Sequence, residues 1–321
     1  MRNRVAVLGA LCAMFCLILA PGEAIESARC GLSLCAELIV PSLLPFFTAS
    51  ALLIRLGVPQ TLGRVLAPLA RRLWGVSGAG ASAFFAGICG GYPLGAQTVA
   101  ELYAVGQIKK DEAERLLRFC NNSGPSFLVG VIGAGIFSSS AAGLLLYCVH
   151  VSSALLVGML IRRRAPDAAP QPAAEVGIAE ALVASVRQAV SAVLGVCGFV
   201  VCFCVLAGLL DALGLWSAAA AALSRLFRAE EQDIRALLIG MLELSSGVGV
   251  LRGLPPTRGR FVLAAFLSGW GGFSVCFQTM AVLAETDLDA RGHLVGRALS
   301  AVFSALLAAA VLRFFPVLPA V

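Results

Sequence analysis

Long apolar stretches with short polar interruptions dominate this chain, and several have the length of membrane-spanning helices. Nearly unbroken apolar runs cover Leu38–Leu56, Ala141–Ile161, Val186–Leu210 and Leu294–Phe315. Each is close to the roughly 20 residues that an α-helix needs to cross a bilayer core about 30 Å thick. Backbone polar groups in lipid must be satisfied within the segment, which favours helices. The pattern predicts an all-α, polytopic membrane protein.

Two further apolar runs are interrupted at their centres and are too short to cross the membrane twice. Ser77–Tyr103 contains Gly90-Gly-Tyr-Pro93, which leaves arms of about ten residues that cannot each span the bilayer at about 1.5 Å per residue. This predicts a re-entrant helical hairpin. Ile234–Leu254 is broken in the same way at Glu243–Gly249 and predicts a second hairpin.

Two other runs are long enough to span but contain helix breakers. Ala113–Phe137 includes Asn121-Asn-Ser-Gly-Pro125, and Phe261–Leu283 includes Ser268-Gly-Trp-Gly-Gly-Phe-Ser274. Proline removes a backbone donor and clashes with the preceding turn, and glycine weakens a helix. Both segments are therefore predicted to be broken spans.

The order span, hairpin, broken span, span occurs twice, and it divides the chain. We expect an N-terminal membrane helix and interfacial segment at 1–36, a first repeat at 37–164, an Ala- and Pro-rich linker at 165–184 and a second repeat at 185–321. The total is about seven spanning helices plus two re-entrant hairpins. With the N-terminus inside, sixteen of the 24 Lys and Arg residues are cytoplasmic and the repeats are inverted.

The N-terminal region and the first connecting segment carry more polar residues. Val5–Ala20 follows two arginines and precedes Pro21-Gly22, so it has the form of a signal peptide or of a first membrane helix. We favour a retained helix, with a cleaved signal as the alternative. Glu23–Ala36 is expected to be a short amphipathic interfacial segment, and Arg55–Arg72 a basic loop.

Composition agrees with a multi-pass protein of the cell membrane. Hydrophobic residues make up 59% and charged residues 13% of the chain, and the mean hydropathy is +0.92. The net charge of +6 comes from Lys and Arg clustered between apolar runs, which indicates membrane topology and no nucleic-acid partner.

Metal and enzyme chemistry find little support in the residues. The 11 cysteines lie mostly in apolar runs without a CxxC pair, and His150 and His293 lie far apart, so we expect no metal site and no cofactor. The chain contains no G-x-S-x-G, H-E-x-x-H or P-loop motif, and we do not expect an enzyme.

Polar side chains near the four interruptions are the candidate site. Secondary transporters build substrate sites from broken helices near the middle of the bilayer, with freed backbone groups and polar side chains facing a cavity. The alternative is that these small polar residues pack helix against helix. The candidate substrate-binding residues are Asn121, Asn122, Ser123, Tyr92, Gln97, Thr98, Ser245, Ser246, Ser274 and Gln278.

Glu243 is the ionisable residue placed deepest in an apolar run. A carboxylate within the membrane is costly and indicates a functional site, here an ion-coupling group for a proton or another cation. The alternative is that it accepts hydrogen bonds from Ser245, Ser246 or freed N–H groups at the hairpin tip.

Four segments together resemble a known family. Pro41-Ser-Leu-Leu-Pro-Phe-Phe47, Gly91-Tyr-Pro-Leu-Gly-Ala-Gln-Thr98, Glu114-Arg-Leu-Leu-Arg-Phe-Cys-Asn-Asn-Ser-Gly-Pro125 and Gly271-Gly-Phe-Ser-Val-Cys-Phe-Gln278 are similar to the YlbJ-type sporulation integral membrane proteins. These belong to the nucleoside-recognition (Gate) group, which resembles parts of concentrative nucleoside transporters and of ferrous-iron transporters. The resemblance implies a multi-pass membrane protein linked to spore cortex formation.

Two functions follow as hypotheses. The first is a secondary transporter or permease for a small polar solute, nucleoside-like or an organic anion, working in the lipid bilayer and possible as a homo-oligomer. The second is a non-transporting membrane scaffold or assembly factor in sporulation complexes. Solute binding distinguishes the two.

Overall fold

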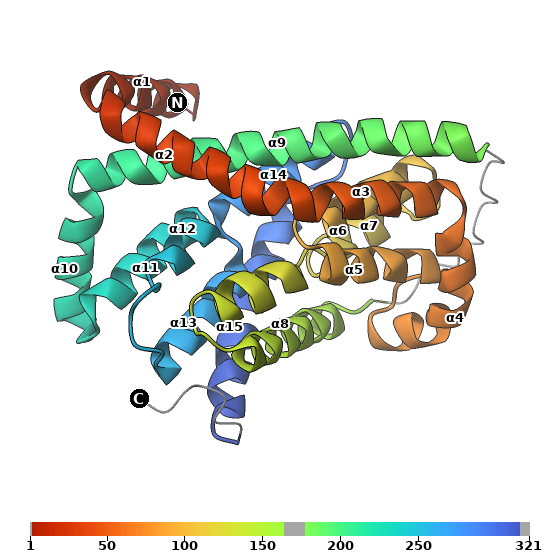
Figure 1. The fold of residues 1–321 in the computed structure, drawn as a ribbon. Coiled ribbons are helices and arrows are strands. Elements are labelled where there is room, and N and C mark those ends of the chain that lie inside the picture. Colours follow the sequence, from red (N-terminus) through yellow and green to blue (C-terminus); the bar gives the residue numbers. More distant parts are fainter. Residues whose placement is uncertain (1, 164–176, 315–321) are drawn as a thin grey trace.

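The structure is a computed structural model that describes residues 2–163 and 177–314. Every regular element in these ranges is a helix, and the helices form one bundle (Figure 1). The prediction of an all-α membrane fold is confirmed.

The N-terminal helices differ from the expected interfacial segment. α1 (Arg2–Leu19) is followed by α2 (Pro21–Leu34), η1 (Cys35–Ile39) and α3 (Val40–Arg55). The chain bends by 103° between α1 and α2. From Pro21 it continues as one helix to Arg55, beside α9 (Ile178–Ala212). The segment predicted at Glu23–Ala36 is therefore part of a longer helix and not a short separate one, and its interfacial position stays a prediction. The π-helical turn η1 ends two residues before Pro41, whose missing N–H and ring disturb regular α-helix.

The basic loop predicted at Arg55–Arg72 is also wrong, because this segment is helix α4 (Val58–Leu73). Pro59 lies in its first turn, where a proline costs no hydrogen bond. Ala70 is buried whereas Val65 and Leu69 are exposed, and two arginines occupy the last turn. The helix is amphipathic. Counting its arginines without testing for a helical period therefore predicted a loop.

The rest of the first half follows the predicted order. α5 (Gly78–Gly90) and α6 (Leu94–Ala104) form the first hairpin. The first broken helix consists of α7 (Lys110–Leu116), an irregular segment and the π-helical η2 (Ser126–Ala134), and α8 (Ser140–Leu160) is the straight helix after it.

The second half repeats this series after α9. Residues 165–176 of the predicted linker lie outside the described residues. Residues 178–184 form the first turns of α9, so α9 begins earlier than expected. α10 (Leu215–Phe227) is followed by the second hairpin, α11 (Glu231–Leu242) with α12 (Leu244–Gly249). The second broken helix is α13 (Arg258–Trp270) with α14 (Gly272–Leu283), and α15 (Arg291–Val311) is the last straight helix.

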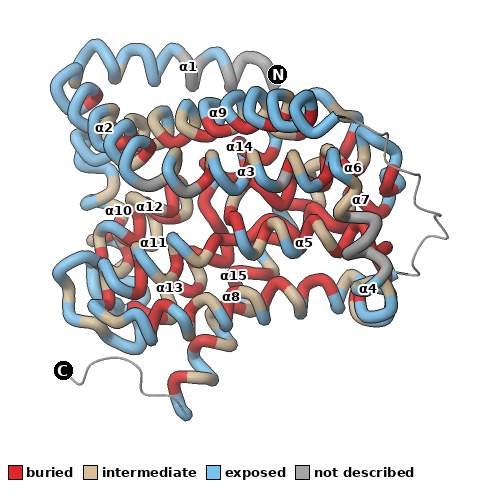
Figure 2. Tube along the Cα trace, turned by 45° about the vertical axis from the view of Figure 1, so that its right-hand side comes forward, coloured by how far each residue is buried: buried red, intermediate tan, exposed pale blue. Residues whose placement is uncertain are grey.

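The two halves are arranged in inverted order. α4 and α10 occupy the same place in each series, yet they lie at opposite ends of the bundle (Figures 1 and 2). In the described residues, four helices are long and apolar enough to span a membrane, or up to six if each bent pair is one span; the sequence predicts about seven.

Buried residues concentrate where the interrupted helices meet. Figure 2 shows them in the middle of the bundle, beneath the exposed outer faces of α1, α9 and α10. Trp74, Phe84 and Phe119 form one aromatic group, with ring centroids 5.2 to 6.1 Å apart. Phe137 and Phe261, 5.7 Å apart, belong to a second apolar cluster around α8, α13 and α15. These clusters hold the helix breaks in fixed positions.

Candidate functional site

The tip of the first hairpin packs directly on the break of the first broken helix. Gly91 has a φ of 88°, and a Cβ at this residue would lie 2.9 Å from the backbone nitrogen of Gly124. A side chain would be unfavourable on both counts. Tyr92 and Pro93, joined by a cis peptide bond, complete the tip. The two irregular segments therefore form one packed unit.

The second hairpin and the second broken helix meet in the same way. Gly271 and Gly272 separate α13 from α14 with φ values of 85° and 84°, and a Cβ on Gly272 would lie 3.1 Å from the carbonyl oxygen of Leu242. The Trp270 indole N–H donates to the Met241 carbonyl at 3.0 Å. Each half of the protein thus presents a hairpin tip backed by a broken helix.

A cavity lies where these irregular segments meet, bounded by η1, α3 and α9 on the other side. It holds about 670 Å³ of empty space including its opening. Most of the wall is apolar. Five of the candidate residues line it: Tyr92, Ser123, Glu243, Ser245 and Gln278.

Glu243 is both a helix cap and part of the cavity wall. It separates α11 from α12, and its carboxylate oxygens accept hydrogen bonds from the backbone N–H groups of Ser245 (3.1 Å) and Ser246 (2.6 Å). The residue is only 3% exposed. The hydrogen bonds of the alternative interpretation, in which Glu243 caps the hairpin tip, are therefore present. Ion coupling by Glu243 stays a prediction.

The asparagine pair lies behind the cavity wall. Asn121 and Asn122 are completely buried, and neither lines the cavity. Asn121 Nδ2 donates to Thr279 Oγ1 on α14 at 2.9 Å, and Asn122 Nδ2 donates to the Phe119 carbonyl at 2.9 Å. Asn121 thus ties the two broken helices together, and Asn122 stabilises the backbone of the first break, next to Ser123 at the cavity.

Of the remaining candidate residues on α14 and α12, some line the cavity and others lie behind its wall. Gln278 reaches the cavity and donates to Ser274 Oγ, one turn earlier and buried behind it, at 3.1 Å. Ser246 lies outside the lining, with its hydroxyl 3.8 Å from Cys204 Sγ of α9.

Gln97 lies in a second cavity, between α6, α9 and α14. This cavity holds about 1250 Å³ of empty space including its opening, and Gln278 and Val196 line both cavities, so the two adjoin. Gln97 and Gln188 side-chain amides donate to the same Glu101 carboxylate oxygen, at 3.0 and 2.5 Å. Thr98 is buried and lines neither cavity.

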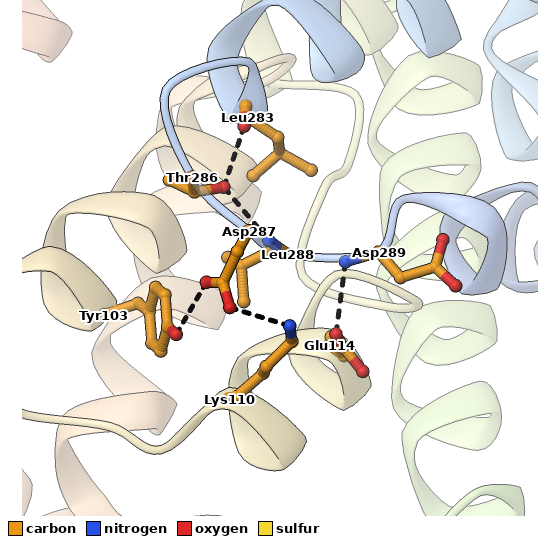
Figure 3. A network of polar contacts seen from close by, with 8 residues as sticks. All are labelled: Tyr103, Lys110, Glu114, Leu283, Thr286, Asp287, Leu288 and Asp289. Atoms are coloured by element: carbon orange, nitrogen blue, oxygen red, sulfur yellow. Dashed lines mark hydrogen bonds and ion pairs between the residues drawn. The ribbon is translucent and has the colours of Figure 1, made fainter.

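The loop after α14 forms a polar network with α6 and α7 (Figure 3). In the sequence, this network directly follows Glu285 and Thr286, which line the second cavity. Asp287 accepts hydrogen bonds from the Tyr103 hydroxyl at 2.7 Å and from Lys110 Nζ at 2.8 Å, and the Asp289 N–H donates to Glu114 at 3.1 Å. The Lys110 ammonium and the Tyr103 hydroxyl hold the pKa of Asp287 below its ordinary value. The network joins this loop to the first hairpin and to α7.

Two central residues were not predicted as site residues. Arg297 is completely buried and donates to Asn121, Tyr92 and the second break. Its signal in the sequence is that it is the single charged residue within Leu294–Leu312. His150 accepts from the Ser123 N–H at 3.0 Å; an isolated histidine in an apolar run carries no comparable signal.

Two inverted halves, hairpin tips and broken helices around a cavity define a multi-pass membrane protein with a transporter-type architecture. The fold is that of CNTnw, a concentrative nucleoside transporter. A variant of CNTnw in its intermediate 1 state matches with a TM-score of 0.57 at 15% identity, covering 96% of this chain and 84% of that one.

Sequence comparison assigns the family. Residues 37–160 match the nucleoside-recognition (Gate) family. The chain is 31% identical, over an alignment of 315 residues, to the sporulation integral membrane protein YlbJ of Bacillus subtilis (strain 168), covering 89% of this chain and 76% of the relative. The protein belongs to this family of sporulation integral membrane proteins, and it is a multi-pass membrane protein.

Proposed function

We propose that the protein is a secondary transporter or permease that moves a small polar solute through the central cavity. The observation that carries the proposal is the meeting of two hairpin tips and two broken helices, one of each from either half, at one cavity. This arrangement is how secondary transporters build a site that opens alternately to either side.

The lining supports a solute with both donor and acceptor groups. Glu243 offers carboxylate oxygens, Ser123 and Ser245 offer hydroxyls, and Gln278 offers an amide, among apolar walls. A nucleoside-like solute or a small organic anion meets this description. The relationship to a sporulation integral membrane protein supports a role in sporulation, and we extend the proposal to spore cortex formation.

The second cavity supports an access route. It adjoins the central cavity at Gln278 and extends to the loop that holds Glu285 and Thr286. Under the proposal a solute passes Gln278 on its way between this opening and the central site.

Self-association belongs to the proposal as well. The outer face of α9 exposes large apolar side chains, among them Val183 (55%) and Leu194 (65%). Such a face suits lipid or a second copy of the chain.

The test is thermal unfolding of the purified protein in detergent against nucleosides, nucleobases, amino acids, pyridine dicarboxylates and simple anions. A solute at a hundred times its Kd should add about 2.7 kcal/mol to the free energy of unfolding. Gln278→Ala should remove most of this gain because the amide faces the cavity. The matched control is Gln107→Ala, a buried glutamine that lines neither cavity.

Stabilisation of the wild type and of Gln107→Ala, but not of Gln278→Ala, would support the site. Absence of any solute effect at several pH values would favour the non-transporting scaffold instead. Equal stabilisation of all three proteins would place binding elsewhere.

A further inference from the structure

Arg297, in the first half of α15, brings a full positive charge to the place where the two helix breaks meet. Its side chain is completely buried. Nε donates to the Trp270 carbonyl at 3.2 Å, and Nη1 donates to the Asn121 carbonyl. Nη2 donates to the carbonyls of Ser268, at 3.2 Å, and of Gly269. One guanidinium group thus binds four backbone carbonyls from two interrupted helices.

These carbonyls are the ones that helix breaks leave free. The last turn of an α-helix has carbonyls without partners inside the helix, and it carries the negative end of the helix dipole. Ser268, Gly269 and Trp270 form the end of α13, and Asn121 lies in the irregular segment after α7. In transporters, unwound carbonyls and half-helix C-terminal ends commonly coordinate Na⁺ or H⁺.

Close helix packing brings the arginine to this position. A Cβ on Gly296 would lie 1.9 Å from the Arg118 carbonyl oxygen, so α15 contacts the start of the first break directly. A Cβ on Gly269 would lie 2.6 Å from the Cα of Ala301, so α13 packs equally closely on α15. Glycine on both sides allows the guanidinium to lie between the breaks.

The charge is met by dipoles instead of a carboxylate. No carboxylate of the described residues forms an ion pair with Arg297. The Tyr92 hydroxyl accepts a further hydrogen bond from Nη2 at 2.8 Å and itself donates to the Ser268 carbonyl at 2.5 Å. The guanidinium carbon lies 5.1 Å from the centre of the Tyr92 ring. A buried cation is costly unless it is well satisfied, and here carbonyls, hydroxyl and ring provide that satisfaction.

We propose that Arg297 is a tethered cation that occupies the carbonyl cluster of the two helix breaks in place of a bound metal cation such as Na⁺. The breaks are therefore assembled without Na⁺, and the solute binds without it. The statement about solute binding rests on the proposed function, whereas the statement about assembly does not.

The test compares thermal unfolding in NaCl and in choline chloride at equal ionic strength. The wild-type midpoint should agree in the two salts within about 1 °C, because no Na⁺ is bound. Arg297→Ala leaves several carbonyls unsatisfied and should lower the midpoint by about 5–10 °C. Low millimolar guanidinium should recover part of this loss in Arg297→Ala, because it can replace the missing group, and should leave the wild type unchanged.

Two variants separate this role from ordinary packing or surface charge. Arg291→Ala removes an exposed arginine, 93% exposed at its side chain, from the same helix and should show neither loss nor rescue. Arg297→Lys keeps the charge but offers a compact ammonium that cannot satisfy both breaks, so it should lie between wild type and Arg297→Ala.

A saturable stabilisation of the wild type by Na⁺ over choline would overturn the proposal, and this result needs no variant to fold. Arg297→Ala without any recovery in guanidinium would also overturn it. These stability measurements need no solute, so they remain decisive if the proposed transport function fails. Where the solute panel yields a ligand, its stabilisation of the wild type should be equal in both salts.

Discussion

At the scale of residues, some polar groups line the cavity and others support its wall from behind. Glu243, Ser245 and Gln278 line the cavity, whereas Asn121 and Asn122 use their amides to fix the first break. Both sets are polar and lie in apolar runs, so the sequence predicts them equally. Only the direction of each side chain, which depends on packing between distant helices, distinguishes them.

Asp287 provides a residue-scale test of the network in Figure 3. Its folded pKa is lowered from 3.8, so its contribution to stability is fully present above pH 3.8 and is lost as the pH falls through the lower folded value. Asp287→Asn should therefore unfold at a lower temperature than wild type near neutral pH. The difference should shrink in acid.

Thermal unfolding across the acid range measures this effect. Asp289→Asn is the control, because its side chain lacks the bonds to Tyr103 and Lys110. A difference between Asp287→Asn and wild type that stays constant into acid would contradict the assignment.

At the scale of elements, the interruptions could be predicted because glycine and proline act locally. Gly90-Gly-Tyr-Pro93, Gly124-Pro125 and Gly271-Gly272 each mark a break that the structure contains. The helix α4 was harder to predict, because a segment with several arginines suggests a loop unless the helical spacing of its apolar residues is tested. α2 and α3 form one continuous helix that packs along α9, and sequence patterns do not show such contacts between distant segments.

Gly91→Ala tests the packing of the first hairpin on the first break. Its positive φ and the 2.9 Å approach to Gly124 should cost about 1–3 kcal/mol or more in the free energy of unfolding. Gly130→Ala is the matched control, because nothing lies within 4 Å of its added Cβ. In a helical segment this control should be neutral or stabilising by up to about 1 kcal/mol. Equal stability of the two variants in thermal unfolding would contradict the close packing.

At the scale of the whole molecule, two series of helices surround one site in opposite directions. The repeated order is visible in the sequence because each element carries its own pattern. The meeting of the halves at Arg297 is not, because it joins Asn121 and Trp270, which lie far apart in the chain. Arg297 was not predicted as a site residue, and its partners cannot be inferred from the apolar run that contains it.

Inversion can be tested with epitope insertions at the exposed turns before α4 and before α10, next to Gly57 and Gly214. The two epitopes should be accessible from opposite sides of the membrane. Protease protection in sealed vesicles of both orientations measures this. Accessibility from the same side would contradict the inverted arrangement.

The most direct measurement of the central claim is uptake of the stabilising solute into proteoliposomes. The account predicts uptake by the wild type in choline as well as in sodium, and a loss of at least about tenfold in Gln278→Ala, since a change of about 1.4 kcal/mol at the site is tenfold in binding. Glu243→Gln should abolish any dependence on an imposed pH gradient. Binding without uptake in wild-type vesicles, or undiminished uptake in Gln278→Ala, would contradict the account.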